Sequence, residues 1–217
     1  MNGRIVPANE SATISEDQLA CEYKRSKFKA EGLALEFFTK QGLPVVIVNP
    51  SAPVGPGDVK PTPTGQIIVD FLNRRMPAHL DTGLNWVHVR DVAVGHILAA
   101  EKGRLGERYI LGNVAGNWTL QETFAVLEKI TGVPAPRHQV PYWLALGWAE
   151  ISEAIARFTG KAPQATLAGV RMARHKMWFD PNKAVRELGL PQTSPEQAFA
   201  DAVAWFRANA YVRGHKN

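Results

Sequence analysis

The sequence lacks most of the features that identify secreted, membrane-spanning and zinc-binding proteins. Its single cysteine, Cys21, excludes an internal disulfide framework and a cysteine-rich zinc site, and its six histidines show no metal-ligand spacing. The first residues contain no apolar signal-peptide core. The longest apolar stretch, Val140 to Ala149, is far shorter than the roughly 20 residues that span a bilayer. These absences favour a cytoplasmic protein with no bound metal and no membrane span.

Composition and charge are those of an ordinary globular protein. The 217 residues are 45% apolar, which is enough to bury the core of one domain and argues against wholesale disorder. The formal net charge of +5 suits an anionic cofactor or substrate. It is too small to indicate a nucleic-acid-binding protein, because such proteins concentrate positive charge in a strongly basic patch or motif.

The chain begins with a polar loop and then alternates between helical and strand patterns. Ser15, followed by two acidic residues, is expected to cap a long helix that ends at Gly42. The β-branched run Val45–Val48 that follows predicts a buried parallel strand. Residues 49–65 hold five prolines and three glycines, so they predict an ordered loop.

The rest of the chain carries mainly helical patterns with a few short strands. Strands are expected near His79 and Leu80, at 85–89 and at 108–111, and Asp91 is expected to cap the helix after the second of them. The remaining helices are expected at residues 65–73, 92–102, 119–131, 141–159, 166–177, 181–188 and 195–210. This order predicts an α/β fold joined to a mainly helical subdomain.

Tyr23 and Lys27 form a Tyr-x-x-x-Lys pair on the first predicted helix. A spacing of four residues places both side chains on one helical face. A phenol holds its proton too tightly for acid–base catalysis at neutral pH, and a neighbouring ammonium group favours the phenolate form. The pair could therefore exchange a proton with a substrate hydroxyl or carbonyl group. Spacing alone leaves open the alternative of a plain surface helix in a lysine-rich stretch.

Two further blocks follow the Tyr-Lys pair in a characteristic order. The predicted strand after the helix runs into Asn49-Pro50-Ser51, and Trp86–Ala93 forms a strand that leads into another helix. Together with the Tyr23-Lys24-Arg25-Ser26-Lys27 segment, these blocks resemble the extended short-chain dehydrogenase/reductase superfamily, in its NAD-dependent epimerase/dehydratase family. Over residues 15–212 the chain most resembles the hopanoid-associated sugar epimerases, which neighbour the dihydroflavonol-reductase-like branch.

The resemblance implies a cofactor and the residues that contact it. The cofactor would be NAD or NADP. Tyr23 would be the catalytic acid/base, and Lys27 would bind the nicotinamide ribose and tune Tyr23. Asn49, Pro50 and Ser51 would lie along the nicotinamide, with backbone groups near its carboxamide.

The predicted substrate-binding residues are Gln66, Arg74 and Arg75. The resemblance implies that the proline- and glycine-rich loop and the helix that carries Gln66 border a pocket for a sugar-like or carbonyl small molecule. Arginine can bind a diphosphate or carboxylate through two parallel hydrogen bonds. For Arg74 and Arg75, the residues alone leave open a role as solvated surface side chains.

The sequence contains no glycine-rich phosphate-binding turn, neither G-x-G-x-x-G nor G-x-x-G-x-x-G. A Rossmann fold normally begins with a strand, this turn and a helix that holds the pyrophosphate. The chain is therefore expected to be the C-terminal part of a Rossmann-like, doubly wound parallel sheet with a mainly helical substrate-binding subdomain. Residues 1–60 would be the remnant of the Rossmann domain, and residues 61–217 the substrate-side subdomain.

Two functional hypotheses remain open. In the first, the chain is the C-terminal portion of an NAD(P)-dependent nucleotide-sugar epimerase or carbonyl reductase, which transfers a hydride at a hydroxyl-bearing carbon. Without a phosphate-binding turn, the chain by itself is expected to be inactive. In the second, the chain is a truncated or split non-catalytic module that binds substrate or a complementary N-terminal chain. A homodimer is a further option for its assembly.

Overall fold

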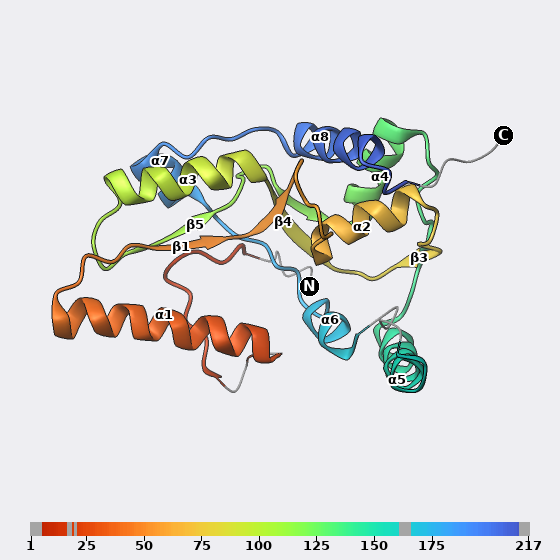
Figure 1. The fold of residues 1–217 in the computed structure, drawn as a ribbon, viewed down its shortest axis with the longest axis horizontal. Coiled ribbons are helices and arrows are strands. Elements are labelled where there is room, and N and C mark those ends of the chain that lie inside the picture. The colour runs from red at the N-terminus through yellow and green to blue at the C-terminus, as the bar shows by residue number, and fades with distance from the viewer. Residues whose placement is uncertain (1–5, 17–18, 20, 161–165, 213–217) are drawn as a thin grey trace.

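The computed structural model describes residues 6–16, 19, 21–160 and 166–212. Short strands form its centre, and helices lie on both sides of them (Figure 1). The elements in chain order are α1 (Glu22–Gln41), β1 (Ile47–Pro50), β2 (Ala52–Val54), α2 (Pro63–Leu72), β3 (Ala78–His79), β4 (Gly83–His88), α3 (Val89–Lys102), β5 (Arg108–Leu111), β6 (Asn117–Thr119), α4 (Leu120–Thr131), β7 (His138–Gln139), α5 (Tyr142–Thr159), α6 (Leu167–Met172), α7 (Asn182–Leu188) and α8 (Pro195–Ala208). This arrangement confirms the predicted α/β class.

Helix α1 begins later than the sequence pattern predicts. Its first residue is Glu22, so the expected cap at Ser15 is wrong. Instead, Glu16 lies beside the helix, with its Oε1 3.1 Å from Lys29 Nζ. In a continuous helix these two residues would be about 20 Å apart. The predicted end is confirmed, because Gly42 adopts the left-handed conformation, with φ of 68°, that closes the helix.

Strands β1 and β5 form a parallel pair beneath α3 and α7, with α1 on the opposite side (Figure 1). The parallel pairing of the β-branched run is confirmed, with Ile47 opposite Arg108 and Pro50 opposite Leu111. Its predicted burial is wrong, because the residues of β1 are half-buried or exposed. Within the described residues, β5 is the single strand that pairs with β1, so the other edge of β1 remains open.

A second sheet begins inside the segment that the sequence predicts to be a loop. Strand β2 pairs in parallel with β4, and β4 pairs antiparallel with β6. Pro53 lies in the middle of β2, and its carbonyl accepts a hydrogen bond from Thr64 Oγ1, so its polar groups point away from β4. The nitrogen and carbonyl of one strand residue point to the same edge, so the missing N–H of Pro53 lies outside the ladder with β4.

Helix α3 is capped by His88, so the prediction of Asp91 as its cap is wrong. Nδ1 of His88 accepts a hydrogen bond from the Arg90 N–H at 3.0 Å. Asp91 lies in the first turn and is 4% exposed. Its carboxylate accepts hydrogen bonds from the Thr193 N–H and hydroxyl, at 2.7 and 2.9 Å. These bonds satisfy a buried carboxylate and join α3 to the segment that precedes α8.

Two apolar clusters hold the layers together. In the larger one, α2, α4 and α8 pack against β2 and β4. Phe71 and Phe124 stack there with ring centroids 5.7 Å apart, and Phe199 packs edge-on against Trp86 at 5.0 Å. The smaller cluster joins α3 and α7 to β5.

The predicted division of the chain into residues 1–60 and 61–217 stays a prediction. Strand β5, from the second of these segments, does return to pair with β1 from the first.

The remaining elements lie beside α2, on the side of the molecule that also carries α1 (Figure 1). Strand β3 pairs in parallel with β7, and α5 and α6 follow. Helix α6 ends at Met172, five residues before the predicted end at residue 177, because Met177 donates its N–H to Gly83 and pairs with β4. Within the described residues, no helix is both long enough and apolar enough to cross a membrane.

Candidate functional site

Tyr23 and Lys27 lie one turn apart at the start of α1. Lys27 Nζ is 5.7 Å from the centroid of the Tyr23 ring. Tyr23 is 68% exposed, and Lys27 is exposed as well. An ammonium group at this distance is attracted to the face of the ring. The structure therefore brings the two predicted catalytic residues together and leaves the phenol open to a ligand.

Tyr23 lines a cavity of about 390 Å³ with the loop Pro53–Asp58 and the first turn of α2. Asp58 fixes the end of this loop, because its carboxylate accepts hydrogen bonds of 3.0 Å from the N–H and the hydroxyl of Thr62. Gly55 has a φ of 153°, and a Cβ there would lie 2.6 Å from a methyl group of Val89. Only glycine fits this close approach. The proline- and glycine-rich loop thus forms a fixed wall of the cavity at Tyr23.

The predicted nicotinamide segment, Asn49, Pro50 and Ser51, lies at the carboxyl end of β1. It lines a different cavity, of about 550 Å³, between α1, β1 and the N-terminal segment around residues 8–14. The Ser51 hydroxyl donates to Asn85 Oδ1 at 2.9 Å. The carboxyl ends of parallel strands are where α/β sheets bind ligands. None of the cavities described for this structure, however, is lined by both this segment and the predicted catalytic pair.

Glu31 connects the helix of the predicted catalytic pair to the predicted nicotinamide segment. Its Oε1 lies 3.2 Å from Arg108 Nη1, and its Oε2 accepts a hydrogen bond of 3.3 Å from Asn49 Nδ2. Helix α1 has no fully buried residue among those described, so apolar burial holds it only weakly. The contacts of Glu31 therefore help to fix α1 over β1 and β5.

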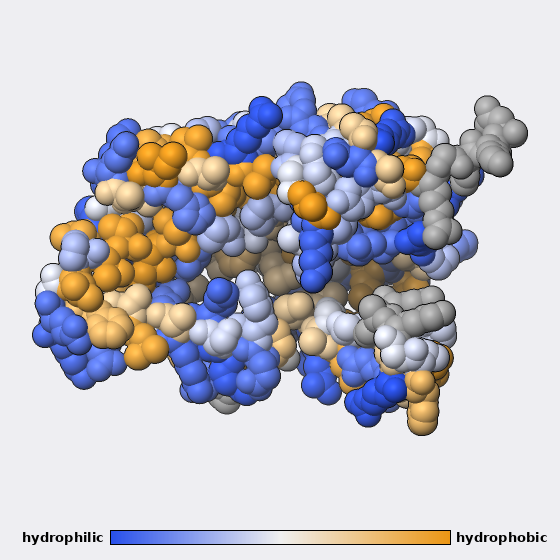
Figure 2. Space-filling view, viewed as in Figure 1, coloured by the Kyte–Doolittle hydropathy of each residue, from blue (hydrophilic) through white to orange (hydrophobic). Residues whose placement is uncertain are grey.

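A larger cavity, of about 780 Å³, lies between α2, β3, α5 and α6, and sequence reasoning missed it. Figure 2 shows hydrophobic residues deep in the hollow above α6 and α5. His79 lines this cavity, is 8% exposed, and has no hydrogen-bond partner for Nδ1 among the described residues. Three of the four methionines, Met76, Met172 and Met177, also line it. They are far apart in sequence, so only the fold reveals the cluster.

The predicted substrate-binding residues lie on and just after α2, around Asp70. Gln66 Nε2 donates to Asp70 Oδ1 at 2.9 Å, and Arg75 Nη1 lies 3.5 Å from the same oxygen. Arg74 is exposed and adopts a φ of 55°. None of Gln66, Arg74 and Arg75 lines the cavities of 390, 550 or 780 Å³. Their role in substrate binding stays a prediction.

His88 links the strand beside the Tyr23 cavity to α8. Its ring is 2% exposed, and Nε2 lies 3.1 Å from Asp201 Oδ2. This hydrogen bond, and a second one of 2.7 Å from Gln197 Nε2, hold the pKa of Asp201 below its ordinary value. Because Nδ1 of His88 accepts the Arg90 N–H, the neutral ring carries its proton on Nε2 and donates it to Asp201. Both ring nitrogens of His88 therefore make hydrogen bonds within the protein: Nε2 with Asp201, and Nδ1 as the cap of α3.

The residues present fit one end of a nicotinamide dinucleotide. The Tyr23 phenol lies on a cavity wall and the exposed Lys27 ammonium group lies over its ring, where the two could meet a reacting carbonyl oxygen and a ribose hydroxyl. The diphosphate end requires backbone N–H groups of a glycine-rich turn at the start of a helix. This sequence does not contain such a turn.

Comparisons with known proteins agree with the sequence blocks. The family model described as NAD dependent epimerase/dehydratase matches residues 2–112. A Synechocystis protein named after dihydroflavonol 4-reductase is 49% identical over 95% of this chain and 60% of its own length. Sterol demethylase protein B of Methylococcus capsulatus is 36% identical over 94% of this chain and 62% of its own length. The solved structure of a nucleoside-diphosphate-sugar epimerase from Pseudomonas aeruginosa superposes with a TM-score of 0.77 at 26% identity, covering 96% of this chain and 63% of that one.

The matches show how much of its relatives this chain covers and to which family it belongs. The chain spans about 60% of the length of the curated relatives it matches. The family model covers about half of the chain, including the Tyr-Lys helix and strands β1 to β5. This chain belongs to the NAD-dependent epimerase/dehydratase family, within the extended short-chain dehydrogenase/reductase superfamily.

Proposed function

We propose that this chain supplies the acid–base half of the active site of an NAD(P)-dependent carbonyl reductase or sugar epimerase. The observation that carries the proposal is the Tyr23–Lys27 pair: the exposed Tyr23 lines a cavity, and the Lys27 ammonium group lies 5.7 Å from the centroid of its ring. The NAD dependence of the family supports the choice of hydride chemistry.

The chemistry follows from the two side chains. A nicotinamide dinucleotide, when bound, supplies or accepts the hydride. In the direction of reduction, Tyr23 donates its proton to the carbonyl oxygen while the carbon gains the hydride, so that an alcohol forms. Lys27 stabilises the phenolate that remains, and solvent restores the proton because Tyr23 is 68% exposed. Epimerisation uses the two directions in turn, with the hydride returned to the other face of the carbon.

The test uses the full product of the open reading frame and follows the oxidation of NADH or NADPH with carbonyl substrates. Tyr23→Phe removes the transferable proton and is expected to lower kcat/KM about a hundredfold or more. Lys27→Met is expected to lower it as well and to raise the KM for the dinucleotide. Tyr142→Phe and Lys40→Met are the matched controls, since neither residue lines the Tyr23 cavity. Wild-type turnover in Tyr23→Phe would overturn the proposal.

A second candidate is a split or truncated module that completes its sheet with a complementary chain. Strand β1 has an open edge within the described residues, and Leu33 and Phe37 of α1 are 55% and 44% exposed. An open edge beside exposed apolar side chains favours pairing with a further strand. A homodimer would be a different way to cover the same surface.

The module can be tested by co-expression with the part of the Synechocystis relative that this chain does not match. The expected result is a one-to-one complex that binds NADH, measured by sedimentation and by fluorescence titration. A stable monomer that forms no complex contradicts this second candidate. A dimer of the chain alone would assign the exposed surface to self-association.

A further inference from the structure

We propose that the 780 Å³ cavity holds the body of a neutral, largely hydrocarbon ketone or alcohol. The inference rests on the proposed function, because the reactive carbon of the same molecule would lie at Tyr23. It assigns the substrate to an apolar class and excludes a nucleoside diphosphate sugar from this cavity.

The walls of the cavity carry no charge. The side chains that line it include Ile67, Leu144, Val170 and Met172, and among the described lining residues none is Asp, Glu, Lys or Arg. Its volume lies within the range of small-molecule sites in proteins. Methionine adapts its shape to irregular apolar ligands, and three of the lining residues are methionines. The lining thus suits a hydrocarbon skeleton of several rings or a long chain.

A nucleoside diphosphate needs a different lining. Proteins bind a diphosphate with arginine or lysine side chains, or with the free N–H groups at the start of a helix. The nearby basic residues do not serve this cavity. Arg171 and Arg174 are exposed and are absent from its walls, and Lys176 is paired with Asp81 at 3.3 Å. A diphosphate placed there would lose its hydration without gaining a countercharge.

The polar side chains in the wall are few, namely those of Thr64, Thr82 and His79. His79 is 8% exposed, and its Nδ1 is buried and has no hydrogen-bond partner within the described part of the chain. The residue is held in place, because its carbonyl accepts the Val140 N–H at 2.8 Å and its ring packs edge-on against the core residue Phe124 at 6.0 Å. Because Nδ1 is buried, it offers a ligand in the cavity no hydrogen bond, and His79 contributes to the wall by packing.

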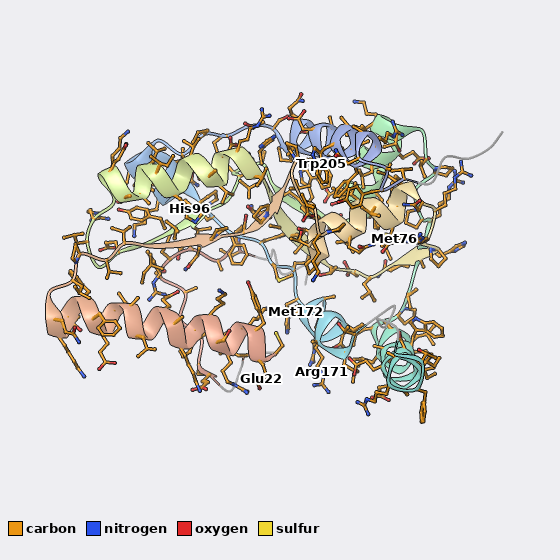
Figure 3. All side chains as sticks on the ribbon, in the orientation of Figure 1. Glu22, Met76, His96, Arg171, Met172 and Trp205 are labelled. Carbon is orange, nitrogen blue, oxygen red and sulfur yellow. The ribbon has the colours of Figure 1, made fainter. Side chains whose placement is uncertain are left out.

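The cavity adjoins the Tyr23 cavity across a shared wall. Pro63 and Thr64, in the first turn of α2, line both this cavity and the 390 Å³ cavity that Tyr23 lines. On the other side, Met172 of the cavity wall touches Cys21, two residues before Tyr23, with sulfur atoms 3.9 Å apart. Figure 3 shows Met172 beside the start of α1 and Met76 on the opposite side, near α2 and β3. One molecule could thus fill the apolar cavity and extend past α2 to the phenol.

Exposed apolar side chains also lie at the edge of the cavity. Leu144 and Trp148 of α5 line it, and each is 50% exposed. A bound apolar body would cover both side chains, and the removal of their surface from water would favour binding. Trp148 also provides a fluorescence signal for that event.

The binding test uses two probes, progesterone and methyl undecyl ketone, titrated into the protein while tryptophan fluorescence is recorded. Progesterone is a neutral polycyclic molecule with a ketone at each end. The expected result is saturable binding of both probes that UDP-glucose does not displace. Ala145→Phe, which fills the cavity, should lower both affinities about tenfold or more, because the ligand loses the space for its apolar body. Ala154→Phe on the exposed side of the same helix is the control and should leave both affinities unchanged.

His79→Phe tests whether the substrate is held by apolar contact. The substitution removes a buried, unpaired nitrogen, so the melting temperature should stay equal or rise, and the affinity for progesterone should stay within about twofold of that of the wild-type protein. A tenfold loss of affinity at an unchanged melting temperature would contradict binding by apolar contact alone. Failure of both probes to bind the folded wild-type protein, or their displacement by UDP-glucose, would overturn the assignment of an apolar substrate.

Activity measurements distinguish a failure of this inference from a failure of the proposed function. In the full product of the open reading frame, Tyr23→Phe should abolish reduction of progesterone by NADPH and leave its binding intact. If Tyr23→Phe abolishes turnover of UDP-glucose and the apolar ketones are inert, the substrate class is wrong and the role of Tyr23 stands. If apolar ketones bind as expected but Tyr23→Phe turns them over normally, the role of Tyr23 is wrong and the cavity assignment stands.

Discussion

Cys21 Sγ lies 3.9 Å from Met172 Sδ, and this contact joins the N-terminal end of α1 to α6. Cys21 precedes Tyr23 by two residues, and Met172 lines the apolar cavity. The contact therefore joins the helix that carries the proposed catalytic pair to the cavity wall that would hold the body of a substrate.

The first prediction concerns the accessibility of the Cys21 thiol. Met172→Ala removes the side chain that covers it, so the reaction of the thiol with Ellman's reagent should become about threefold faster or more. Progesterone bound in the apolar cavity of the wild-type protein should slow the same reaction by restraining Met172. Because the chain contains one cysteine, the absorbance change reports this site alone.

Met76→Ala is the control for that measurement, because Met76 lines the same cavity but lies near α2 and β3. In Met76→Ala, the Cys21 thiol should react at the same rate as in the wild-type protein. Equal rates in Met172→Ala and the wild-type protein would show that the sulfur contact does not cover Cys21 in solution.

The second prediction concerns binding of the dinucleotide. The chain by itself should bind NADH and NADPH only at millimolar concentrations, because the Tyr-Lys pair contacts a ribose but no glycine-rich turn is present to hold the diphosphate. Fluorescence titration of NADH with the chain measures this directly. Micromolar affinity would mean that other N–H groups of the chain form a phosphate site.

Local sequence signals predicted those parts of the fold that depend on neighbouring residues. The left-handed Gly42 and the helical spacing of Tyr23 and Lys27 are fixed within a few positions. The parts that were missed depend on distant partners. Pro53 lies in a strand because β2 pairs with β4, where it is opposite Val87, and Asp91 accepts hydrogen bonds from Thr193, about a hundred residues away.

In the candidate site, too, the sequence predicted some features and missed others. The Tyr23–Lys27 pair was singled out by its spacing together with the neighbouring sequence blocks that resemble the family, whereas the apolar cavity is assembled from α2, β3, α5 and α6. No window of the sequence shows that Met76 and Met172 share one wall. Tertiary packing creates that information, so sequence reasoning assigned the substrate to the sugar-like or carbonyl class from family resemblance alone.

The third prediction concerns the larger apolar cluster. Phe124 is fully buried and stacks on Phe71 at 5.7 Å. Phe124→Ala should lower the free energy of unfolding by about 3–5 kcal/mol, because the lost burial is followed by a cavity that rigid neighbours fill only in part. Phe158→Ala, at a side chain that is 92% exposed, is the matched control and should change it little. Urea unfolding measures both, and similar values for the two variants would contradict the packing described for α4.

The last prediction concerns the response of stability to acid. The hydrogen bond from His88 Nε2, followed by that from Gln197, lowers the pKa of Asp201 in the folded protein. A lowered folded pKa means that this carboxylate contributes stability in full above its unfolded pKa of about 3.9, and that the contribution is lost as the pH falls through the lowered value. Asp201→Asn keeps the shape of the side chain and removes the charge. The difference in unfolding free energy between the wild-type protein and Asp201→Asn should therefore be largest near neutral pH and shrink once the pH falls below about 4. Urea unfolding across that range measures it, with Glu128→Gln as the control for loss of one exposed carboxylate. A difference that stays constant down to the acid end would show that the Asp201 side chain stabilises α8 through its shape and not through its charge.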